Sequence, residues 1–355
     1  MDSIYSPYKV SHHLKRIEQL RKGELIVPTQ AQIDITNKCN HRCPNCICRF
    51  YKSIGLNATY DNNQSIPIDR IIKILDELKE VGVPSIEYTG GGEPQCHPDF
   101  SSVLNETIDR GFEWSLVTNG ALSNLKRDIL YFKKAKWIRV SVDASNANTH
   151  SIMHGTSIDD FDKIVQFIRI LVNECKDTII GVSFLVSSIN YKEIVEATRM
   201  FKNLGCSNMR FAVVYNPKGM KLYDGIWDEI VDLMKEAKKL ETKKFKVFDL
   251  IHTTSHDMIT YKRDYSFCGY QQFTTIIGAD QNVYPCCTLR YNEATSLGDL
   301  SKQSFKDIWF GEKRRNWLKS DYLNGICSNH SCLMDKKNEF IDYLVQENPP
   351  HANYI

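Results

Sequence analysis

Between residues 31 and 214 the sequence alternates short runs of β-forming residues with amphipathic helical patterns, at a repeat of roughly 30 residues. One such unit is long enough for a strand and a crossover helix, the combination that builds a parallel sheet. The six strands that this pattern predicts are Gln32–Thr36, Ser85–Thr89, Glu113–Thr118, Trp137–Val142, Ile179–Val186 and Met209–Val214. The chain is therefore predicted to be an α/β protein with a partial (β/α)6 barrel.

The helical segments carry their own start and stop signals. Pro67 precedes an apolar stripe that begins at Ile68, and Gly82 closes it, as expected for a helix that starts after proline and stops at glycine. The other predicted helices of the barrel are Phe100–Arg110, Asn124–Ala135, Ile158–Cys175 and Tyr191–Leu204. After a charged helix at about residues 224–241 the alternation stops, so a domain boundary is expected near Lys243. The predicted organisation is an N-terminal extension (1–30), the barrel (31–242), a cysteine-rich domain (243–334) and a C-terminal tail (335–355) that contains a helix.

Charge and hydropathy exclude several classes of protein. The 45 basic and 43 acidic residues leave a net charge of +2, so no electrostatic footprint for nucleic acid is expected. The most apolar stretch, residues 178–191, is interrupted by polar side chains and is shorter than the ~18 residues of a membrane helix. The first residues lack the pattern of a secretory signal. We therefore expect a cytoplasmic protein with no membrane partner.

Three of the twelve cysteines, Cys39, Cys43 and Cys46, form a C-x3-C-x2-C pattern directly after the first predicted strand. Loops at the carboxyl ends of parallel strands are where such folds place their chemistry. Three thiolates this close need a metal or a cluster to offset their repulsion. A structural zinc ion takes four ligands, whereas three cysteines on a four-iron cluster leave one iron open to a small molecule. The spacing therefore favours a four-iron cluster, and a structural zinc site is the alternative interpretation.

Together with three further motifs, the triplet resembles the radical S-adenosylmethionine (SAM) superfamily. These motifs are TGGGEP at residues 89–94, VTNG at 117–120 and VSVDA at 140–144, each at the end of a predicted strand. The resemblance covers roughly residues 30–215 and implies a TIM-like partial barrel that cleaves SAM reductively to a 5'-deoxyadenosyl radical. It implies that Cys39, Cys43 and Cys46 hold a [4Fe-4S] cluster and that SAM is bound by Gly91, Gly92, Glu93, Asn119, Ser141 and Asp143. It also implies a flavodoxin- or ferredoxin-type reductant as partner.

This chain departs from the family pattern at one position. Relatives carry an aromatic residue directly before the third cysteine, where this chain has Asn45. Phe50 and Tyr51 are the candidates to replace it beside adenine. Both belong to a long polar loop, residues 50–65, which we interpret as a lid over the site.

A second group of cysteines lies beyond residue 243. Cys268 and Cys286 flank the sequence of a tight hairpin that turns at residues 279–282, and Cys327 and Cys332 follow. This arrangement resembles the auxiliary-cluster domains of the SPASM and twitch branches, and it implies that these four cysteines hold a second [4Fe-4S] cluster. A full SPASM domain needs about seven cysteines, so a one-cluster, twitch-like domain is the expectation here. Cys287 is the alternative to Cys286 as a ligand. A zinc ion that only stabilises this domain is the other alternative.

The function implied is hydrogen abstraction from an unactivated C–H bond, most simply to oxidise the substrate. Only 38 residues precede the first cysteine, so a fused peptide-recognition domain of about 80 residues is not expected. This favours a carbohydrate-like or other small polar substrate over a peptide or protein that is oxidised, epimerised or cross-linked. A noncatalytic iron-sulfur or zinc scaffold is a further alternative, but it leaves the three glycine- and asparagine-containing motifs unexplained.

The other cysteines and the histidines have separate interpretations. Cys96, on the loop after the second strand, is a candidate hydrogen-atom donor for epimerisation, but oxidation is the expected outcome. Cys48, Cys175 and Cys206 are interpreted as packing residues. His12, His13 and His41 have no second ligand at metal spacing in the sequence.

Overall fold

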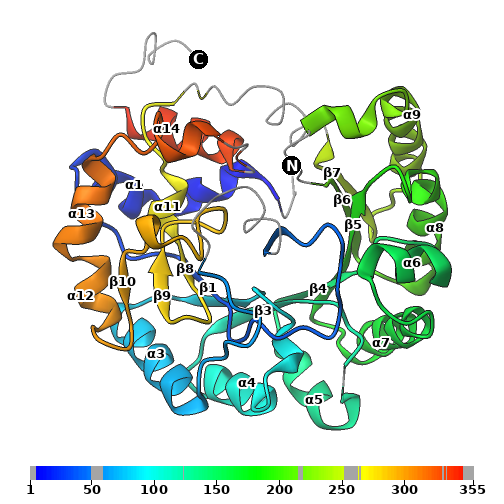
Figure 1. The fold of residues 1–355 in the computed structure, drawn as a ribbon, viewed down its shortest axis with the longest axis horizontal. Coiled ribbons are helices and arrows are strands. Elements are labelled where there is room, and N and C mark those ends of the chain that lie inside the picture. Colours follow the sequence, from blue (N-terminus) through cyan, green and yellow to red (C-terminus); the bar gives the residue numbers. More distant parts are fainter. Residues whose placement is uncertain are drawn as a thin grey trace.

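The computed structural model describes residues 5–48, 59–122, 124–214, 219–251, 263, 265–329, 332 and 334–346. Its centre is a curved sheet in the order β10-β9-β8-β1-β2-β3-β4-β5-β6-β7. In Figure 1 this sheet forms an open arch with helices on its outer side. The parallel strands of the predicted barrel are β1 (Gln30–Ile33), β2 (Ser85–Tyr88), β3 (Glu113–Thr118), β4 (Trp137–Ser141), β5 (Ile179–Val186) and β6 (Asn208–Val213). The α/β fold with a partial barrel is thus confirmed.

The sheet extends past these six strands at both edges. β7 (Lys246–Asp249) pairs parallel with β6, so the βα alternation runs one strand further than the sequence pattern indicates. At the other edge β8 (Thr274–Ile277) pairs parallel with β1. β8 is followed by β9 (Asn282–Tyr284) and β10 (Gly298–Asp299), both antiparallel to their neighbours. The β8–β9 hairpin is the one predicted from the sequence, and Gln281 takes the left-handed φ of 63° that its tight turn needs.

Helices cover the outer face of the arch because the outward-facing side chains of the strands are apolar. The helices that flank the barrel strands are α3 (Ile68–Val81), α4 (Phe100–Asp109), α5 (Leu125–Phe132), α6 (Ala147–His154), α7 (Asp160–Glu174), α8 (Ile194–Leu204) and α9 (Trp227–Lys238). Gly82 ends α3 with a φ of 92°, as the sequence predicts. In β5, for example, Val182 and Phe184 are fully buried in the core shared with these helices. The short helix α6 was not predicted.

The inner face of the arch is polar, in contrast to the close-packed interior of a complete barrel. Gln32, Glu87, Arg139 and Arg210 of β1, β2, β4 and β6 all line a cavity of about 1250 Å³ on this face. A lumen with this lining suits a polar ligand, because burying polar groups without hydrogen-bond partners is energetically unfavourable.

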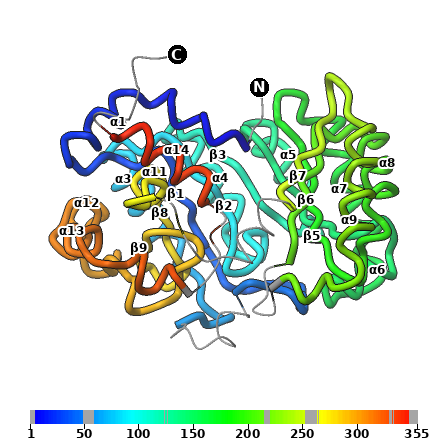
Figure 2. The backbone as a smooth tube through the Cα atoms, turned by 90° about the horizontal axis from the view of Figure 1, so that it is seen from above, coloured from blue at the N-terminus to red at the C-terminus, as the bar shows by residue number. Residues whose placement is uncertain are grey.

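The N- and C-terminal segments pack together over one end of the arch. α1 (Leu14–Arg21) lies beside α14 (Asp335–Val345), and Arg21 donates to the backbone oxygen of Leu344 (Figure 2). The remaining helices among the described residues are α11 (Tyr270–Phe273), α12 (Phe305–Trp309) and α13 (Glu312–Lys319), all in the C-terminal third. Among the described residues, the helices are all too short or too polar to cross a bilayer.

Candidate active site

The three cysteines of the C-x3-C-x2-C pattern lie in the loop that follows β1. Cys39, Cys43 and Cys46 all line one cavity of about 670 Å³. The same cavity is lined by the predicted SAM-binding residues Gly91, Gly92, Glu93, Asn119 and Ser141. The structure therefore brings together, at the carboxyl ends of β1 to β4, four motifs that are up to about 100 residues apart in the chain.

The glycines of the TGGGEP loop are required because the loop lies directly on the chain that leads to the cysteines. A Cβ atom on Gly91 would lie 1.8 Å from Oδ1 of Asn37, and one on Gly92 would lie 2.2 Å from the backbone oxygen of Lys38. The two segments are also joined by hydrogen bonds, since Gly92 N donates to Thr36 O at 3.1 Å. Any side chain here would push the glycine loop away from the cysteine loop.

Glu93 links the glycine loop to the VTNG motif. Its buried carboxylate accepts hydrogen bonds from the backbone N of Asn119 and from the hydroxyl of Thr118, each at 2.7 Å. Burial raises the pKa of Glu93, and the hydrogen bonds oppose that shift. The side chain of Asn119 in turn donates to Oδ1 of Asn40, beside Cys39. The second and third motifs are thus held in one network with the cysteine loop.

Two of the predicted site residues lie away from this cavity. Asp143 has a φ of 58°, and its carboxylate accepts from Leu185 N at 2.7 Å and lies 3.2 Å from Nε2 of His154. Cys96, at the end of a short 3-10 helix (Pro94–Cys96), places its Sγ 3.8 Å from Oδ1 of Asn40. Neither residue belongs to the lining of the cavity that holds the three cysteines.

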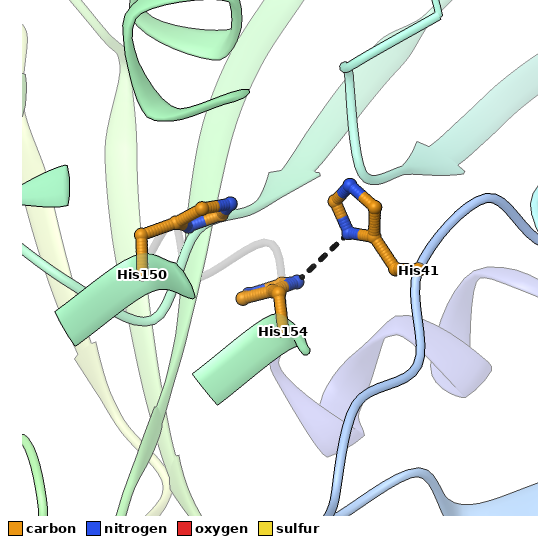
Figure 3. Close-up of side chains that lie close together, drawn as sticks. All are labelled: His41, His150 and His154. Atoms are coloured by element: carbon orange, nitrogen blue, oxygen red, sulfur yellow. Dashed lines mark hydrogen bonds between the residues drawn. The ribbon is translucent and has the colours of Figure 1, made fainter. Parts of the chain in front are cut away.

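A cluster of three buried histidines lies behind the cysteine loop (Figure 3). His41 comes from the loop itself, and His150 and His154 lie one turn apart on α6. Nδ1 of His154 is 3.3 Å from Nδ1 of His41 and 3.7 Å from Sγ of Cys43. The cluster was not predicted, although the i, i+4 spacing of His150 and His154 is a signal that two imidazoles share one helix face.

The histidines differ in charge because their partners differ. Burial lowers the pKa of His41 and His150 to about 4. Burial also opposes protonation of His154, but Asp143 and Cys43 outweigh it and raise its pKa to about 10. The imidazole of His154 is therefore cationic near neutral pH and lies beside Cys43.

The second group of cysteines forms a separate site at the edge of the sheet. Burial raises the pKa of the thiols of Cys268, Cys286, Cys327 and Cys332. Cys268 adds to this shift for the other three, which places the four thiols near one another. Asn338 of α14 closes the site on one side, because its Oδ1 is 3.4 Å from Sγ of Cys268 and accepts from Tyr270 N.

Cys287 faces a different direction from Cys286. It lines the cavity inside the arch, together with Thr288 and Arg290. The charges that act on it, after burial, are those of Arg290, Glu87 and Lys337, which also line that cavity. Cys287 thus lines the lumen, although its charge also raises the pKa of Cys286.

A buried ion pair connects the second site to the first. Arg290 forms this pair with Asp34, at the end of β1, and also donates to Gly90 O at 2.9 Å. The hydroxyl of Tyr291 donates to Oδ2 of the same Asp34 at 2.8 Å. These residues were not predicted, although a charged residue within the apolar run of the first strand is a signal of a buried partner.

Both groups of residues fit iron-sulfur clusters. At the first site, three cysteines share a cavity with a glycine loop whose lack of side chains lets it pack directly on the cysteine loop. At the second site, four partly buried thiols lie together with no disulfide among them. Thiolate sulfurs are the usual ligands of iron in such clusters. Phe50, Tyr51 and most of the predicted lid loop lie outside the described residues.

Comparison with known proteins agrees with this geometry. The profile of the Radical SAM superfamily matches residues 33–201, and that of the SPASM iron-sulfur cluster-binding domain matches residues 268–333. The chain is 26% identical over 328 residues to the tungsten-containing aldehyde ferredoxin oxidoreductase cofactor-modifying protein of Pyrococcus furiosus, covering 84% of this chain and 86% of that protein. It is 31% identical over 123 residues to the S-adenosylmethionine-dependent nucleotide dehydratase of Selenomonas ruminantium, covering 34% of this chain but only 41% of that protein.

A solved structure shows the same fold. The crystal structure of Streptococcus suis SuiB bound to the precursor peptide SuiA superposes with a TM-score of 0.60 at 16% identity, covering 92% of this chain and 73% of that one. The fold and the two cysteine sites define an iron-sulfur enzyme of the α/β barrel class. The chain belongs to the radical SAM superfamily and carries a C-terminal SPASM domain. Its cofactors are accordingly SAM and [4Fe-4S] clusters.

Proposed function

We propose that this radical SAM enzyme oxidises a small polar substrate that is bound inside the arch, between the two cysteine sites. The observation that carries this proposal is the position of the 1250 Å³ cavity. Thr89 and Ile47 line both this cavity and the one that holds Cys39, Cys43 and Cys46. At its other side the same cavity is lined by Cys287, the neighbour of Cys286. A substrate there would lie between the site of SAM and the four-thiol group.

The roles proposed for the residues follow from their positions. Cys39, Cys43 and Cys46 would hold the SAM-binding cluster, and Gly91, Gly92 and Glu93 would receive the amino group of SAM. Asn119 and Ser141, which line the same cavity, would contact the rest of SAM. Asp143 would act through His154 on Cys43, since its carboxylate is 3.2 Å from that imidazole. When bound, the cluster and SAM supply the radical that takes a hydrogen atom from the substrate.

The four-thiol group supports oxidation as the outcome. We propose that Cys268, Cys286, Cys327 and Cys332 hold an auxiliary cluster that accepts the electron left on the substrate. A hydrogen-atom donor would instead lead to epimerisation. Cys96 lines neither the cavity inside the arch nor the cavity that holds Cys39, Cys43 and Cys46. Burial, and after it the charge of Glu93, raises the pKa of Cys96 to about 11. Reaction in deuterated buffer distinguishes the outcomes, because epimerisation through Cys96 would place solvent deuterium on the substrate carbon.

The polar lining of the cavity favours a small polar substrate. Gln32, Glu87, Arg139 and Arg210 can each hydrogen-bond to such a molecule. Two of the relatives are a cofactor-modifying protein and a nucleotide dehydratase, and cofactors and nucleotides are polar small molecules. The second candidate is a peptide substrate, which is favoured by the likeness to SuiB, since that protein is seen bound to its precursor peptide SuiA.

Anaerobic reconstitution followed by dithionite and SAM tests the proposal. The wild-type protein should bind about eight irons and release 5'-deoxyadenosine, as expected for two four-iron clusters. Cys39→Ala should abolish 5'-deoxyadenosine formation. Cys268→Ala should lose about four irons and keep SAM cleavage without substrate oxidation. Cys175→Ala is the matched control, because Cys175 is buried at the end of α7 and should keep both iron and activity. Full iron content in Cys268→Ala would contradict the auxiliary cluster.

A further inference from the structure

Two arginines point into the lumen from strands on either side of β5. Arg139 lies on β4 in register with Gly181 of β5, and Arg210 lies on β6 in register with Ser183. Both line the 1250 Å³ cavity. Because β5 presents a glycine and a serine between them, no large side chain of that strand separates the two guanidinium groups.

Neither guanidinium is neutralised by a carboxylate in the described part of the chain. Arg139 donates to the hydroxyl of Tyr5 at 3.4 Å and lies 5.4 Å from the ring of Trp137. Arg210 lies 5.6 Å from the ring of Tyr5, and its buried Nε has no hydrogen-bond partner. Aromatic contacts stabilise a cation only partly, so among the described residues the Nε donor lacks an acceptor and neither guanidinium has an ion-pair partner.

The nearby carboxylates act on Arg210 at longer range than an ion pair. Burial, with the repulsion of Arg139 added, lowers the pKa of Arg210 to about 10, although Glu87 and Asp143 act in the opposite direction. Both of these carboxylates are held by other partners. Glu87 accepts from the side-chain amides of two glutamines, and Asp143 lies 3.2 Å from the imidazole of His154.

The rim of the cavity adds little to this balance. Lys337 of α14 faces the same cavity as a third cation. Two pairs that also line it neutralise themselves, Lys238 with Glu241 at 3.1 Å and Lys336 with Glu339 at 2.9 Å. Lys246 and Asp249 add one charge of each sign. The two arginines thus remain a centre of positive charge within the lumen.

We propose that Arg139 and Arg210 form a subsite for an anionic group of the substrate, either a phosphate or a carboxylate. The inference rests on the proposed function and narrows its substrate class to an anionic small molecule. Guanidinium groups suit this role because their fixed N–H donors match the oxygens of phosphate and carboxylate. An anion here would supply the missing acceptor for Arg210 Nε and an ion-pair partner for both guanidinium groups.

The subsite lies beside the SAM cavity rather than in it. Arg139 is two residues before Ser141 on β4, so it faces the lumen on the same side of the strand. Ser183, the register partner of Arg210, donates to the hydroxyl of Ser141 at 3.3 Å, and Ser141 lines the SAM cavity. A substrate anchored by its anionic group at the arginines would thus direct its other end toward SAM.

Calorimetric titration of the reconstituted protein with two probes tests the subsite. The probes are sodium pyrophosphate and sodium citrate, at constant ionic strength, under anaerobic conditions. At least one should bind saturably to the wild-type protein, and the preferred probe identifies the anion as phosphate or carboxylate. Arg139→Met and Arg210→Met should each weaken that binding by about tenfold or more. Arg139→Lys, which keeps the charge but loses the planar fork, should weaken it less.

The matched control is Lys239→Met, because Lys239 is exposed on the outer side and pairs with Glu236. It should leave anion binding unchanged. The iron content after reconstitution and the circular dichroism spectrum should match those of the wild type in the arginine variants, which shows that these variants are folded.

Three results would overturn the inference, and a fourth would contradict only the proposed function. No saturable binding by the wild-type protein, or equal binding by wild type and both methionine variants, would overturn the subsite. Loss of SAM affinity in both variants would overturn it too, because the arginines would then belong to the SAM site. Anion binding by a wild-type protein that fails to cleave SAM would support the subsite and contradict only the proposed function.

Discussion

The guanidinium group of Arg290 lies 3.2 Å from the carboxylate of Asp34, and this contact joins the SPASM domain to the end of the first barrel strand. Asp34 is fully buried and Arg290 is 7% exposed. The same guanidinium donates to Gly90 O in the glycine loop. The position of the glycine loop is therefore set partly by the SPASM domain, 200 residues further along the chain.

Arg290→Met should destabilise the protein by about 3 kcal/mol, because it leaves the Asp34 carboxylate buried without its partner. Urea unfolding of the apo-protein, followed by circular dichroism, measures this change. Lys302→Met is the control, since Lys302 forms an exposed pair with Asp299, and it should cost less than about 1 kcal/mol. Equal losses of unfolding free energy in the two variants would show that the buried pair stabilises the protein no more than the exposed pair.

Gly91→Ala should abolish SAM binding and destabilise the fold by about 1–3 kcal/mol. The reason is steric, because the new Cβ would lie 1.8 Å from Oδ1 of Asn37 and 2.7 Å from the hydroxyl oxygen of Tyr291. Equilibrium dialysis with labelled SAM gives the affinity. Gly23→Ala is a fair comparison, since Gly23 has a φ of +71° but no atom within 4 Å of the added Cβ. That variant should cost about 1 kcal/mol and bind SAM normally. Normal SAM binding by Gly91→Ala would refute the close packing of the two loops.

Cys286→Ala and Cys287→Ala should behave differently although the residues are adjacent. Cys286→Ala should lose about four irons on reconstitution, because Cys286 is near the other thiols of the auxiliary site. Cys287→Ala should keep all its iron, because Cys287 lines the lumen. Iron and sulfide analysis of both variants shows which of the two cysteines is the ligand. The reverse result would make Cys287 the ligand.

Stability of the apo-protein should fall as the pH drops below about 6.5, in part because of His97. This buried side chain hydrogen-bonds to Ile66 O at 2.8 Å and accepts from Asp99 N at 3.1 Å, so it is held in the neutral form. Burial lowers its pKa below the ordinary 6.5. Below that pH the unfolded chain binds a proton that the folded chain does not, so the stability is complete above about pH 6.5 and is lost at lower pH.

The contribution of His97 is measured by comparing wild type with His97→Gln. Urea unfolding between about pH 7 and pH 5 should show a shallower loss of stability in the variant, by at most about 1.4 kcal/mol per pH unit. Glutamine keeps a donor and an acceptor but does not titrate in this range. Parallel pH profiles would mean that other groups, such as His41 and His150, account for the whole effect.

Local patterns determined much of this protein. The alternation of strand and helix signals predicted the six barrel strands, because the apolar residues of each buried strand are visible in its own sequence. The cysteine spacing and the glycine motif predicted which loops would form the site, because loops after parallel strands meet at one edge. The hairpin around residues 279–282 was equally local, because a tight turn depends on a few consecutive residues.

Other features depended on contacts between distant segments, which no local pattern encodes. β7 and β8 are four-residue strands whose place in the sheet is decided by the free edges of β6 and β1. The orientation of Cys287 toward the lumen follows from how the SPASM hairpin joins β1. Asp143 contacts His154 because α6 brings this imidazole over the end of β4. Arg139 and Arg210, which are far apart in the chain, meet only because the sheet curves and turns both strands toward one lumen. In each case the feature is stabilised by burial and pairing between segments that are distant in the sequence. Only the tertiary structure could therefore reveal these features.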